Sequence, residues 1–580
     1  MVKSERTDGG APVPDLPRHR RRRRVALGVA LATVAVGAVL RQLDAYDVSP
    51  GGAFVQAYVL PIFLALFAIS AIVALFAPLA GAMAGAFTVA LFVPFAFRMV
   101  EFRPGVVLTL VVALQPAAWA LLEFDRRHRV HDIDLTRRRT ALTLVGSVVA
   151  LVAGTFVGRE IWGRLWGPTH PSSTLPDLED SPVDWIWVGA TTSTDFEVRA
   201  RPRDPFTDAV LLVSENEDLV DAREVPFADV FDRVVDFRVG GLDPATRYHY
   251  AVRLDGVVDR IRSGVVRTFP DGPEPVRLVF SACARIGSNG AVFDAIRAEQ
   301  ADAYVCVGDF HYGDIYVDDA DDYRRVFDVQ LTRTAQSALY RSTPIAYVWD
   351  DHDYGPNDSN RDAPGRPAAM AAYREYVPHY ELAGPESAIF QAFSVGSVRV
   401  LLSDCRSSRD PQSVTDTVEK SMLGFEQRAW LLDELTQSSA THDLVIWVST
   451  VPWIAEAREG ADHWGGYTAE RELIADHVAD GGIDNLMMIC GDAHMVAIDD
   501  GTNTDYSSSQ GAGFPLAQAA PLDRPGGVKG GPFTQGPITD SGQYVVVDVT
   551  PEADRTVVDV VAKRWDDTEL LVLTFTVGFS

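Results

Sequence analysis

Residues 303–314 have the sequence AYVCVGDFHYGD, and this stretch decides the fold of the C-terminal half of the chain. Ala303–Val307 is a short, continuous apolar run, which predicts a buried strand. Gly308 and Asp309 end the run, and polar residues follow at once. From Val276 onward, runs of this kind alternate with amphipathic helical patterns, which indicates an α/β domain.

Five further apolar runs end in residues that carry chemistry: Val276–Phe280 with Cys283, Pro344–Val348 with Asp350–Asp353, Val398–Leu402 with Asp404–Arg406, Leu444–Val448 with Ser449, and Leu486–Ile489 with Asp492–His494. Strand C-termini in an α/β sheet form one edge, so these side chains would meet there. Two like charges about 4 Å apart repel by about 4 kcal/mol at an effective dielectric of about 20. Such a cluster requires cations between the carboxylates, and the sequence therefore predicts a metal site.

Each piece also has a purely structural interpretation. A single Gly-Asp after a strand is common turn chemistry, and Cys283 alone is more often a core residue than a ligand. The coincidence of several such strand ends is what favours a metal site. Cys306 and Cys405 are predicted to be buried apolar residues.

The two ends of the chain differ strongly in charge. Residues 1–160 contain 18 Lys and Arg against 11 Asp and Glu, a net charge of +7. Of the 52 basic and 79 acidic residues in the chain, 34 and 68 lie in the remainder, which has a net charge of −34. A surface this acidic argues against nucleic acid as a partner and suits divalent cations.

Residues 25–160 are predicted to form a membrane domain of about five helices, at Val25–Leu40, Phe54–Ala80, Gly81–Phe97, Val106–Glu123 and Thr140–Gly158. The later stretches approach the ~20 residues that cross a bilayer. Only Pro78, Gly81 and Gly85 separate the second stretch from the third, so four helices are the alternative.

Positive charge predicts the orientation. Residues 1–24 form a basic cytoplasmic tail ending in Arg20–Arg24, and the loop Asp125–Arg139 carries six arginines. Five spans put both on the cytoplasmic side, whereas four spans would separate them. We therefore predict a multi-pass plasma-membrane protein with an extracytoplasmic C-terminal part. The spans lack paired ionisable residues, which favours an anchor over a transporter.

A small β domain is predicted between the membrane domain and the α/β domain. Residues 161–183 form a linker, and residues 184–270 show short alternating strands separated by turns, as in a β sandwich. The segment Leu242–Tyr250 resembles the tyrosine corner of fibronectin type III domains, in which a Tyr hydroxyl satisfies backbone polar groups.

The chain from about Asp184 onward resembles the alkaline phosphatase D (PhoD-like) family of the metallophosphoesterase superfamily. The motifs that carry this resemblance are Ser281–Cys283, Gly308–Tyr312, Trp349–Asp353, Asp404–Arg406, Leu423–Leu431, Trp464–Tyr467 and Gly491–His494. The resemblance implies a multidomain protein: after the helical membrane domain come a fibronectin type III-like β sandwich and, over residues 276–580, an α/β metallophosphoesterase domain with two facing sheets between helices.

The resemblance also implies a ferric ion held together with calcium, although other divalent metals would suit the same residue types. Its iron-side ligands correspond to Cys283, Asp309, Tyr312 and His494, with Asp309 bridging, and its calcium ligands to Asp351 and Asp492. Carboxylates suit Ca²⁺, whereas thiolate and phenolate suit a transition metal. The remaining candidates are the catalytic residues His352, Arg406 and Asp350 and the substrate-binding residues Asn357 and Asp358.

Two features leave alternatives open. Arg406 is predicted either to contact phosphate or to form a structural ion pair with Asp404. The chain also departs from the family in lacking a twin-arginine consensus, in His311 and Gly313 beside Tyr312, and in Asp353 where Glu is usual. These departures put the substrate preference in doubt.

The predicted function is hydrolysis of phosphate mono- or diesters outside the cytoplasm, in which a metal-bound hydroxide or oxo group attacks phosphorus. Small phosphate esters, phospholipid headgroups and cell-wall polymers are all reasonable substrates. The alternative is a catalytically idle receptor or binding protein that uses the metalloesterase fold.

Overall fold

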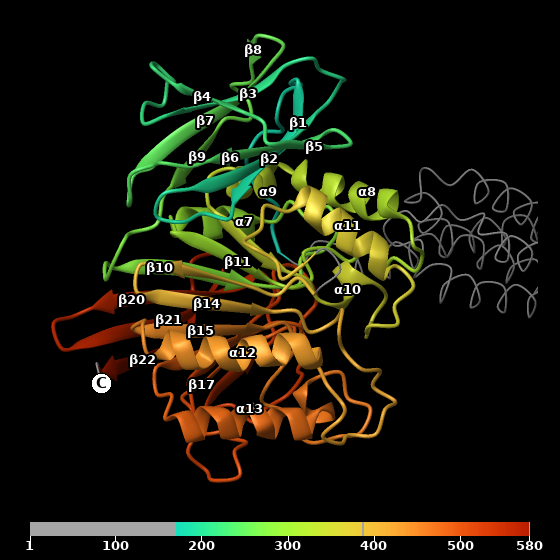
Figure 1. Ribbon diagram of the computed structural model, residues 1–580, viewed down its shortest axis with the longest axis vertical. Helices are drawn as coiled ribbons and strands as arrows, with labels where there is room; N and C mark the ends of the chain where they lie inside the picture. Colours follow the sequence, from blue (N-terminus) through green and yellow to red (C-terminus); the bar gives the residue numbers. More distant parts are fainter. Residues whose placement is uncertain (1–169, 385–387, 579–580) are drawn as a thin grey trace, which may run out of the picture. The chain divides into compact units, whose positions relative to one another are not determined.

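The computed structural model describes residues 170–384 and 388–578, and every structural statement below refers to them. Residues 168–580 form one compact unit. Its described part contains three β-sheets, of ten, seven and five strands, together with α-helices that cover outer faces of the sheets (Figure 1).

The ten-stranded sheet consists of β1 (Val183–Gly189), β2 (Phe196–Pro202), β5 (Asp229–Phe231), β6 (Val234–Val239), β10 (Val276–Ser281), β11 (Ala303–Val307), β12 (Ile345–Val348), β20 (Gln543–Pro551), β21 (Arg555–Arg564) and β22 (Glu569–Gly578). Their order is β22-β21-β20-β10-β11-β12-β1-β2-β6-β5. The strands β10, β11 and β12 are parallel to one another. They are covered on both faces, which is why the sequence reads as continuous apolar runs there.

The seven-stranded sheet consists of β13 (Gln391–Val395), β14 (Val398–Ser403), β15 (Leu444–Ser449), β16 (Leu486–Cys490), β17 (Val496–Asp499), β18 (Leu516–Ala519) and β19 (Gln535–Ile538). Their order is β13-β14-β15-β16-β18-β17-β19, and β14, β15, β16 and β18 run parallel. The carboxyl ends of these strands therefore lie along one edge.

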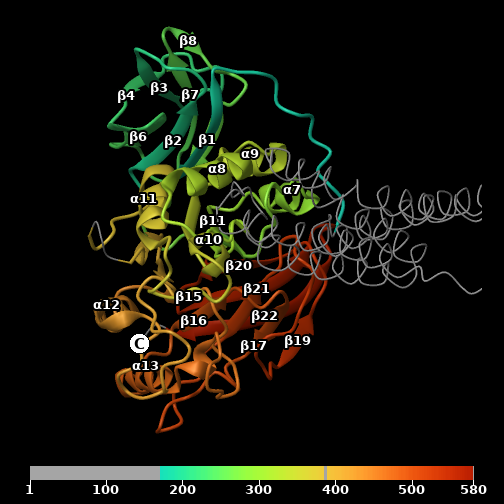
Figure 2. The same ribbon diagram turned by 90° about the vertical axis from the view of Figure 1, so that its right-hand side faces the viewer.

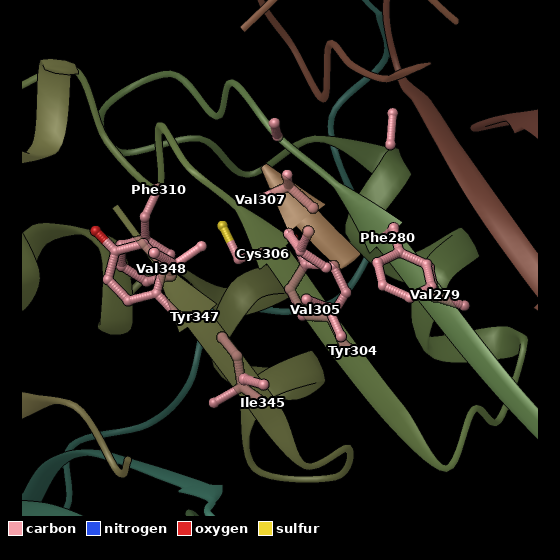
Figure 3. Packing of buried hydrophobic residues seen from close by; sticks show 14 of the residues in the cluster. Val279, Phe280, Tyr304, Val305, Cys306, Val307, Phe310, Ile345, Tyr347 and Val348 are labelled. Carbon is pink, nitrogen blue, oxygen red and sulfur yellow. The ribbon is translucent and has the colours of Figure 1, made fainter. Parts of the chain in front are cut away.

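The ten- and seven-stranded sheets pack face to face. One apolar cluster contains residues from both, among them Val305 on β11, Tyr347 on β12 and Val448 on β15. Figure 3 shows the part of this cluster contributed by β10, β11 and β12, with Phe310 close to Tyr347. Their ring centroids are 5.1 Å apart. This shared core holds the strand ends of the two sheets in one place.

Helices cover the outer faces of the two packed sheets. They are α7 (Ala291–Ala298), α8 (Ala320–Leu331), α9 (Thr334–Tyr340), α10 (Asp351–Tyr354), α11 (Arg366–Tyr376), α12 (Gly424–Ser439) and α13 (Thr468–Gly481), with a 3₁₀ turn, η2, at Trp464–Gly466. Figures 1 and 2 show α12 and α13 on the opposite side of the sheets from α7, α8 and α9. The helix α12, which overlaps the motif Leu423–Leu431, buries Leu431 and Leu435.

The five-stranded sheet consists of β3 (Ala209–Ser214), β4 (Arg223–Pro226), β7 (Arg247–Leu254), β8 (Val257–Val258) and β9 (Gly264–Arg267). It packs on β1, β2 and β6 through an apolar cluster that includes Leu211, Phe237 and Tyr250. The backbone N–H of Asp243 donates to the Tyr248 hydroxyl at 3.0 Å, which is the contact that a tyrosine corner predicts.

The sandwich is continuous with the neighbouring sheet. Gly189 on β1 pairs in parallel with Ile345 on β12, so strands of both regions belong to the ten-stranded sheet. An added Cβ at Gly189 would collide with the Ile345 carbonyl oxygen and with Pro378, so only glycine allows this approach. The predicted boundaries of the linker, of the domain at residues 184–270 and of the domain at residues 276–580 stay predictions.

The predicted membrane helices and multi-pass localisation are corrected. In residues 170–384 and 388–578, no helix combines the length and the apolar character that crossing a bilayer requires. The long apolar segments there are strands, whose apolar side chains are covered by a second sheet or by helices. The fold class is therefore a β-rich α/β architecture, without support for an N-terminal helical membrane domain. The five predicted spans and the basic tail lie outside the described residues.

Candidate metal centre

Turns after three strands carry four candidate ligands on left-handed backbone. The φ angles are +66° at Cys283, +51° at Asp309, +61° at Asp492 and +46° at His494. Non-glycine residues rarely adopt such angles, and each costs on the order of 1–3 kcal/mol. The turns follow β10, β11 and β16 directly, at the edge where the carboxyl ends of the strands lie. Their shared conformation aims side chains from both sheets at one point.

The first donor group joins Cys283, Asp309 and His494, whose ligand atoms all lie within 4.8 Å of one another. The Tyr312 hydroxyl lies between two of them: it donates to Asp309 Oδ2 at 2.6 Å and is 2.8 Å from His494 Nε2. The other carboxylate oxygen of Asp309 is buried without a partner among the described residues. A buried, unpaired carboxylate oxygen beside a thiol, a phenol and an imidazole fits a cation site.

The second donor group joins Asp309, Asp351 and His352, again within 4.8 Å. Asp309 belongs to both groups, as a bridging ligand would. His352 Nδ1 lies 2.6 Å from Asp314 Oδ1, an arrangement that fixes the imidazole ring and leaves Nε2 available. Its ring also packs on Tyr312, with centroids 4.1 Å apart.

A third acidic group joins Asp351, Asp358 and Asp462. The backbone N–H of Asp358 donates to Asp351 Oδ2 at 2.7 Å, so the two residues are held together. Asn357 and Asp358 are both exposed on the loop that follows α10. Asp462 could not be identified from the sequence, because it lies in an irregular segment without a strand directly before it.

Arg406 is fully buried and holds two carboxylates. Its guanidinium donates to both oxygens of Asp350, at 2.5 and 2.9 Å, and to both oxygens of Asp462, at 3.0 and 3.1 Å. Thr450 donates a further hydrogen bond to Asp350. Asp404, the predicted ion-pair partner, instead accepts from the backbone N–H of Arg406 at 2.9 Å. In this arrangement the Arg406 guanidinium and the Asp350 carboxylate bind each other, and the pair supports the site.

The loop before β19 supplies three contacts that the sequence analysis missed. Lys529 Nζ donates to both oxygens of Asp492, at 2.6 and 2.5 Å. His494 Nδ1 is 3.0 Å from the Pro525 carbonyl oxygen, which orients Nε2 toward Tyr312. The Arg524 guanidinium lies over the Tyr312 ring, 4.1 Å from its centroid. Nothing in this Gly- and Pro-rich sequence marks it as part of a site.

The pKa shifts of the donor residues agree with a site that binds a cation. Burial raises the pKa of the Cys283 thiol well above its usual value, and Asp309 and Asp492 raise it further. Burial also raises the pKa of Asp309 to about 7. A bound cation would oppose both shifts, because it stabilises the ionised thiolate and carboxylate. Burial and then Arg524 lower the pKa of His494 to about 3, so its imidazole stays neutral, as a ligand must be.

For His352 and Asp351, neighbouring charges outweigh burial in setting the pKa. Burial alone would lower the pKa of His352, but Asp351, Asp314 and Asp309 raise it well above its usual value. Burial alone would raise the pKa of Asp351, but Arg406, His352 and Lys529 hold it below the ordinary range. Each of these groups is therefore charged because its neighbours carry the opposite charge.

The structure brings the predicted site residues to one region, but not into one ligand shell. Cys283, Asp309, Tyr312 and His494 converge, and Asp351 joins them through Asp309. Asp492 belongs to no group of three donors among the described residues, and Lys529 holds its carboxylate. The individual roles assigned to these residues stay predictions.

Comparison with known proteins agrees with this geometry. Residues 278–520 match the family model of the PhoD-like phosphatases. Alkaline phosphatase D of Bacillus subtilis (strain 168) is 25% identical over 203 residues, which are 30% of this chain and 35% of that protein. The match thus spans about a third of the length of this curated relative.

Two solved structures share the fold. The structure of PhoD has a TM-score of 0.54 at 16% identity and covers 70% of this chain and 92% of that chain. A purple acid phosphatase from yellow lupin (Lupinus luteus) seeds has a TM-score of 0.50 at 12% identity and covers 68% and 74%. At these identities the two structures support the fold alone.

The donor groups and the matches together support the predicted enzyme class, that of the metal-dependent phosphoesterases. Within that class, the similarity of residues 278–520 is to the PhoD-like phosphatases.

Proposed function

We propose that this chain hydrolyses phosphate monoesters, phosphate diesters or both at the candidate metal centre. The convergence of Cys283, Asp309 and His494, with Tyr312 between them, is the observation that carries this proposal. Four donors of four chemical kinds, from three separate turns, have no evident structural purpose at one buried point. A binding protein without catalysis would not need them together.

A ferric ion suits the first donor group, because thiolate and phenolate favour a polarising transition metal. Calcium suits the carboxylates of Asp309, Asp351 and Asp492. Lys529 donates to both oxygens of Asp492, so this carboxylate binds either the lysine or a second cation. When bound, the cations would supply the charge that activates water and neutralises the phosphate oxygens.

The chain's own residues complete the site. His352, held by Asp314 at 2.6 Å, would present a proton from Nε2 to the leaving oxygen of the ester. Lys529 and Arg524 would offer positive charge to the phosphate oxygens beside Asp492 and Tyr312. Arg406 would position Asp350 and Asp462, whereas Asn357 and Asp358 on the exposed loop would contact the rest of the substrate.

The test uses the full chain with p-nitrophenyl phosphate and bis(p-nitrophenyl) phosphate. Chelation should remove turnover, and iron with calcium should restore it, with elemental analysis recording which metals are bound. Asp309→Asn should lower kcat by roughly a hundredfold or more, because it removes the charge shared by both donor groups. Asp255→Asn is the matched control, since Asp255 is also an aspartate at positive φ, in a sandwich turn.

Full turnover by the metal-free chain, or by the Asp309→Asn variant, would contradict the proposal. Metal bound at the site without turnover of either ester would instead support the alternative function, a catalytically idle receptor or binding protein.

A further inference from the structure

One cavity has a charge opposite to that of the chain. The chain has a formal net charge of −27, yet this cavity, of about 240 Å³, is lined by three arginines, Arg260, Arg297 and Arg341, and by one acidic residue, Glu217. It lies between the sandwich strands β7 and β9 and the helices α7 and α9. None of the residues of the metal centre lines it.

Arg341 is the central group of this arginine cavity. Its side chain is mostly buried, and Nη1 lies 3.3 Å from the Ser337 hydroxyl. Among the described residues it forms no ion pair with a carboxylate. Burial lowers the pKa of Arg341, and Arg262 and Arg297 lower it further. A buried cation without a counter-ion is costly, so this position favours an anion supplied from solution.

The other two arginines keep most of their donors free. Arg260 uses one nitrogen, Nη2, on the Asp218 carbonyl oxygen at 3.1 Å. The Arg297 side chain has no hydrogen-bond or ion-pair partner in the described part of the chain, and the residue is exposed on α7. Guanidinium groups with free donors recognise oxyanions through paired hydrogen bonds.

The wall of the cavity is fixed by packing. The Tyr250 hydroxyl donates to the Arg341 carbonyl oxygen at 2.9 Å, and the Val265 N–H donates to the same oxygen at 3.0 Å. A Cβ at Gly264 would collide with the Tyr250 ring and with this oxygen, so the strand and the helix end are in close contact. A rigid wall of this kind reduces the entropy cost of binding.

We propose that the arginine cavity is a binding site for a small oxyanion, a phosphate group or a carboxylate. Leu219, Val265 and Ala338 give it an apolar side, and the Ser263 and Ser342 hydroxyls lie at its lining as well. The volume exceeds that of a bare phosphate ion, so there is room for a ligand with a small organic part. The site is separate from the metal centre and bridges the sandwich and the helical layer.

The experiment titrates the full chain, stripped of metal by a chelator, with inorganic phosphate, citrate or glycerol in a calorimeter. Phosphate or citrate should bind, whereas uncharged glycerol should not. The Arg297→Gln/Arg341→Gln variant should bind whichever of the two anions the wild type prefers with an affinity at least about tenfold lower. Arg247→Gln, on the same strand β7 but outside the cavity, should bind it as the wild type does.

Hydrogen exchange gives the location of binding. The anion should protect residues 260–265 and 337–342, and it should do so in the wild type but not in the double variant. Arg297→Gln alone, on an exposed helix position, keeps the test decisive if the double variant does not fold. The proposal is overturned by equal affinity of wild type and Arg297→Gln/Arg341→Gln, by protection confined to residues 309–314 and 523–529, or by no binding of either anion.

Discussion

Arg406 shows how a charged residue can serve a site without facing its ligand. The side chain has no exposed surface, and it satisfies the buried carboxylates of Asp350 and Asp462 with paired hydrogen bonds. Asp350 follows β12 and Asp462 lies before η2, so one guanidinium joins segments from different layers. A role in holding the site together follows from these contacts.

Replacing Arg406 by Gln should lower the free energy of unfolding by about 3–5 kcal/mol, because the buried Asp350 carboxylate loses its guanidinium partner and that of Asp462 keeps only Arg409 as such a partner. Urea denaturation of metal-free protein measures this. Arg253→Gln, which removes an exposed ion pair with Glu224, should change stability little. Unchanged stability of Arg406→Gln together with weaker phosphate binding would show that Arg406 contacts the substrate instead.

At the scale of elements, the metal centre depends on two sheets meeting at the ends of their strands. Gly491 follows β16 of the seven-stranded sheet and precedes the candidate ligand Asp492. A Cβ there would lie 3.0 Å from the Thr450 carbonyl oxygen and closer still to that of Val307, at the end of β11. The glycine thus permits the approach that brings Asp492 and His494 to Asp309.

Gly491→Ala should push these strand ends apart and lower the free energy of unfolding by about 1–3 kcal/mol. It should also reduce bound metal, because His494 would move away from Cys283 and Asp309. Denaturation and elemental analysis give the two values. Gly511→Ala is the control, since a Cβ at Gly511 would meet nothing within 4 Å. Equal metal content and stability in both variants would contradict this account.

At the scale of the whole molecule, His379 lies where the sandwich meets the helical layer. Its ring stacks on Tyr373 of α11, with centroids 6.2 Å apart, and Nδ1 is 2.8 Å from the Tyr380 carbonyl oxygen. Burial lowers the pKa of His379 to about 4, with a smaller contribution from Arg199 and Arg374. The folded protein therefore holds this imidazole neutral.

Folding depresses the pKa of His379 from about 6.5 in the unfolded chain. The free energy of unfolding is therefore unaffected by protonation of this residue above about pH 6.5, and it decreases as the pH falls from there toward 4. The loss is at most about 3 kcal/mol. His379→Gln should therefore show a shallower fall in unfolding free energy between pH 7 and pH 4.5 than the wild type, by urea denaturation at each pH. Parallel curves would mean that His379 titrates normally in the folded state.

Much of the local structure could be read from the chain because its signals are local. Continuous apolar runs such as Ala303–Val307 became buried strands, and the residues that follow them became ligand-bearing turns. The contacts of Lys529, Asp462 and Asp314 could not be predicted in the same way, because no local pattern distinguishes them from solvated charges. The predicted membrane domain has no support, since no helix in the part of the chain that the structure describes is long and apolar enough to cross a bilayer.

By itself the sequence predicted the strands, the donors at their ends and hence a metal site, since these follow from apolar periodicity and residue type. The enzyme class came from the resemblance of its motifs to the PhoD-like family. Only the tertiary structure decided which donors share a point, that Lys529 holds Asp492, and that Arg406 is occupied by Asp350 and Asp462. These pairings join segments distant in the chain, and the packing of two sheets selects them.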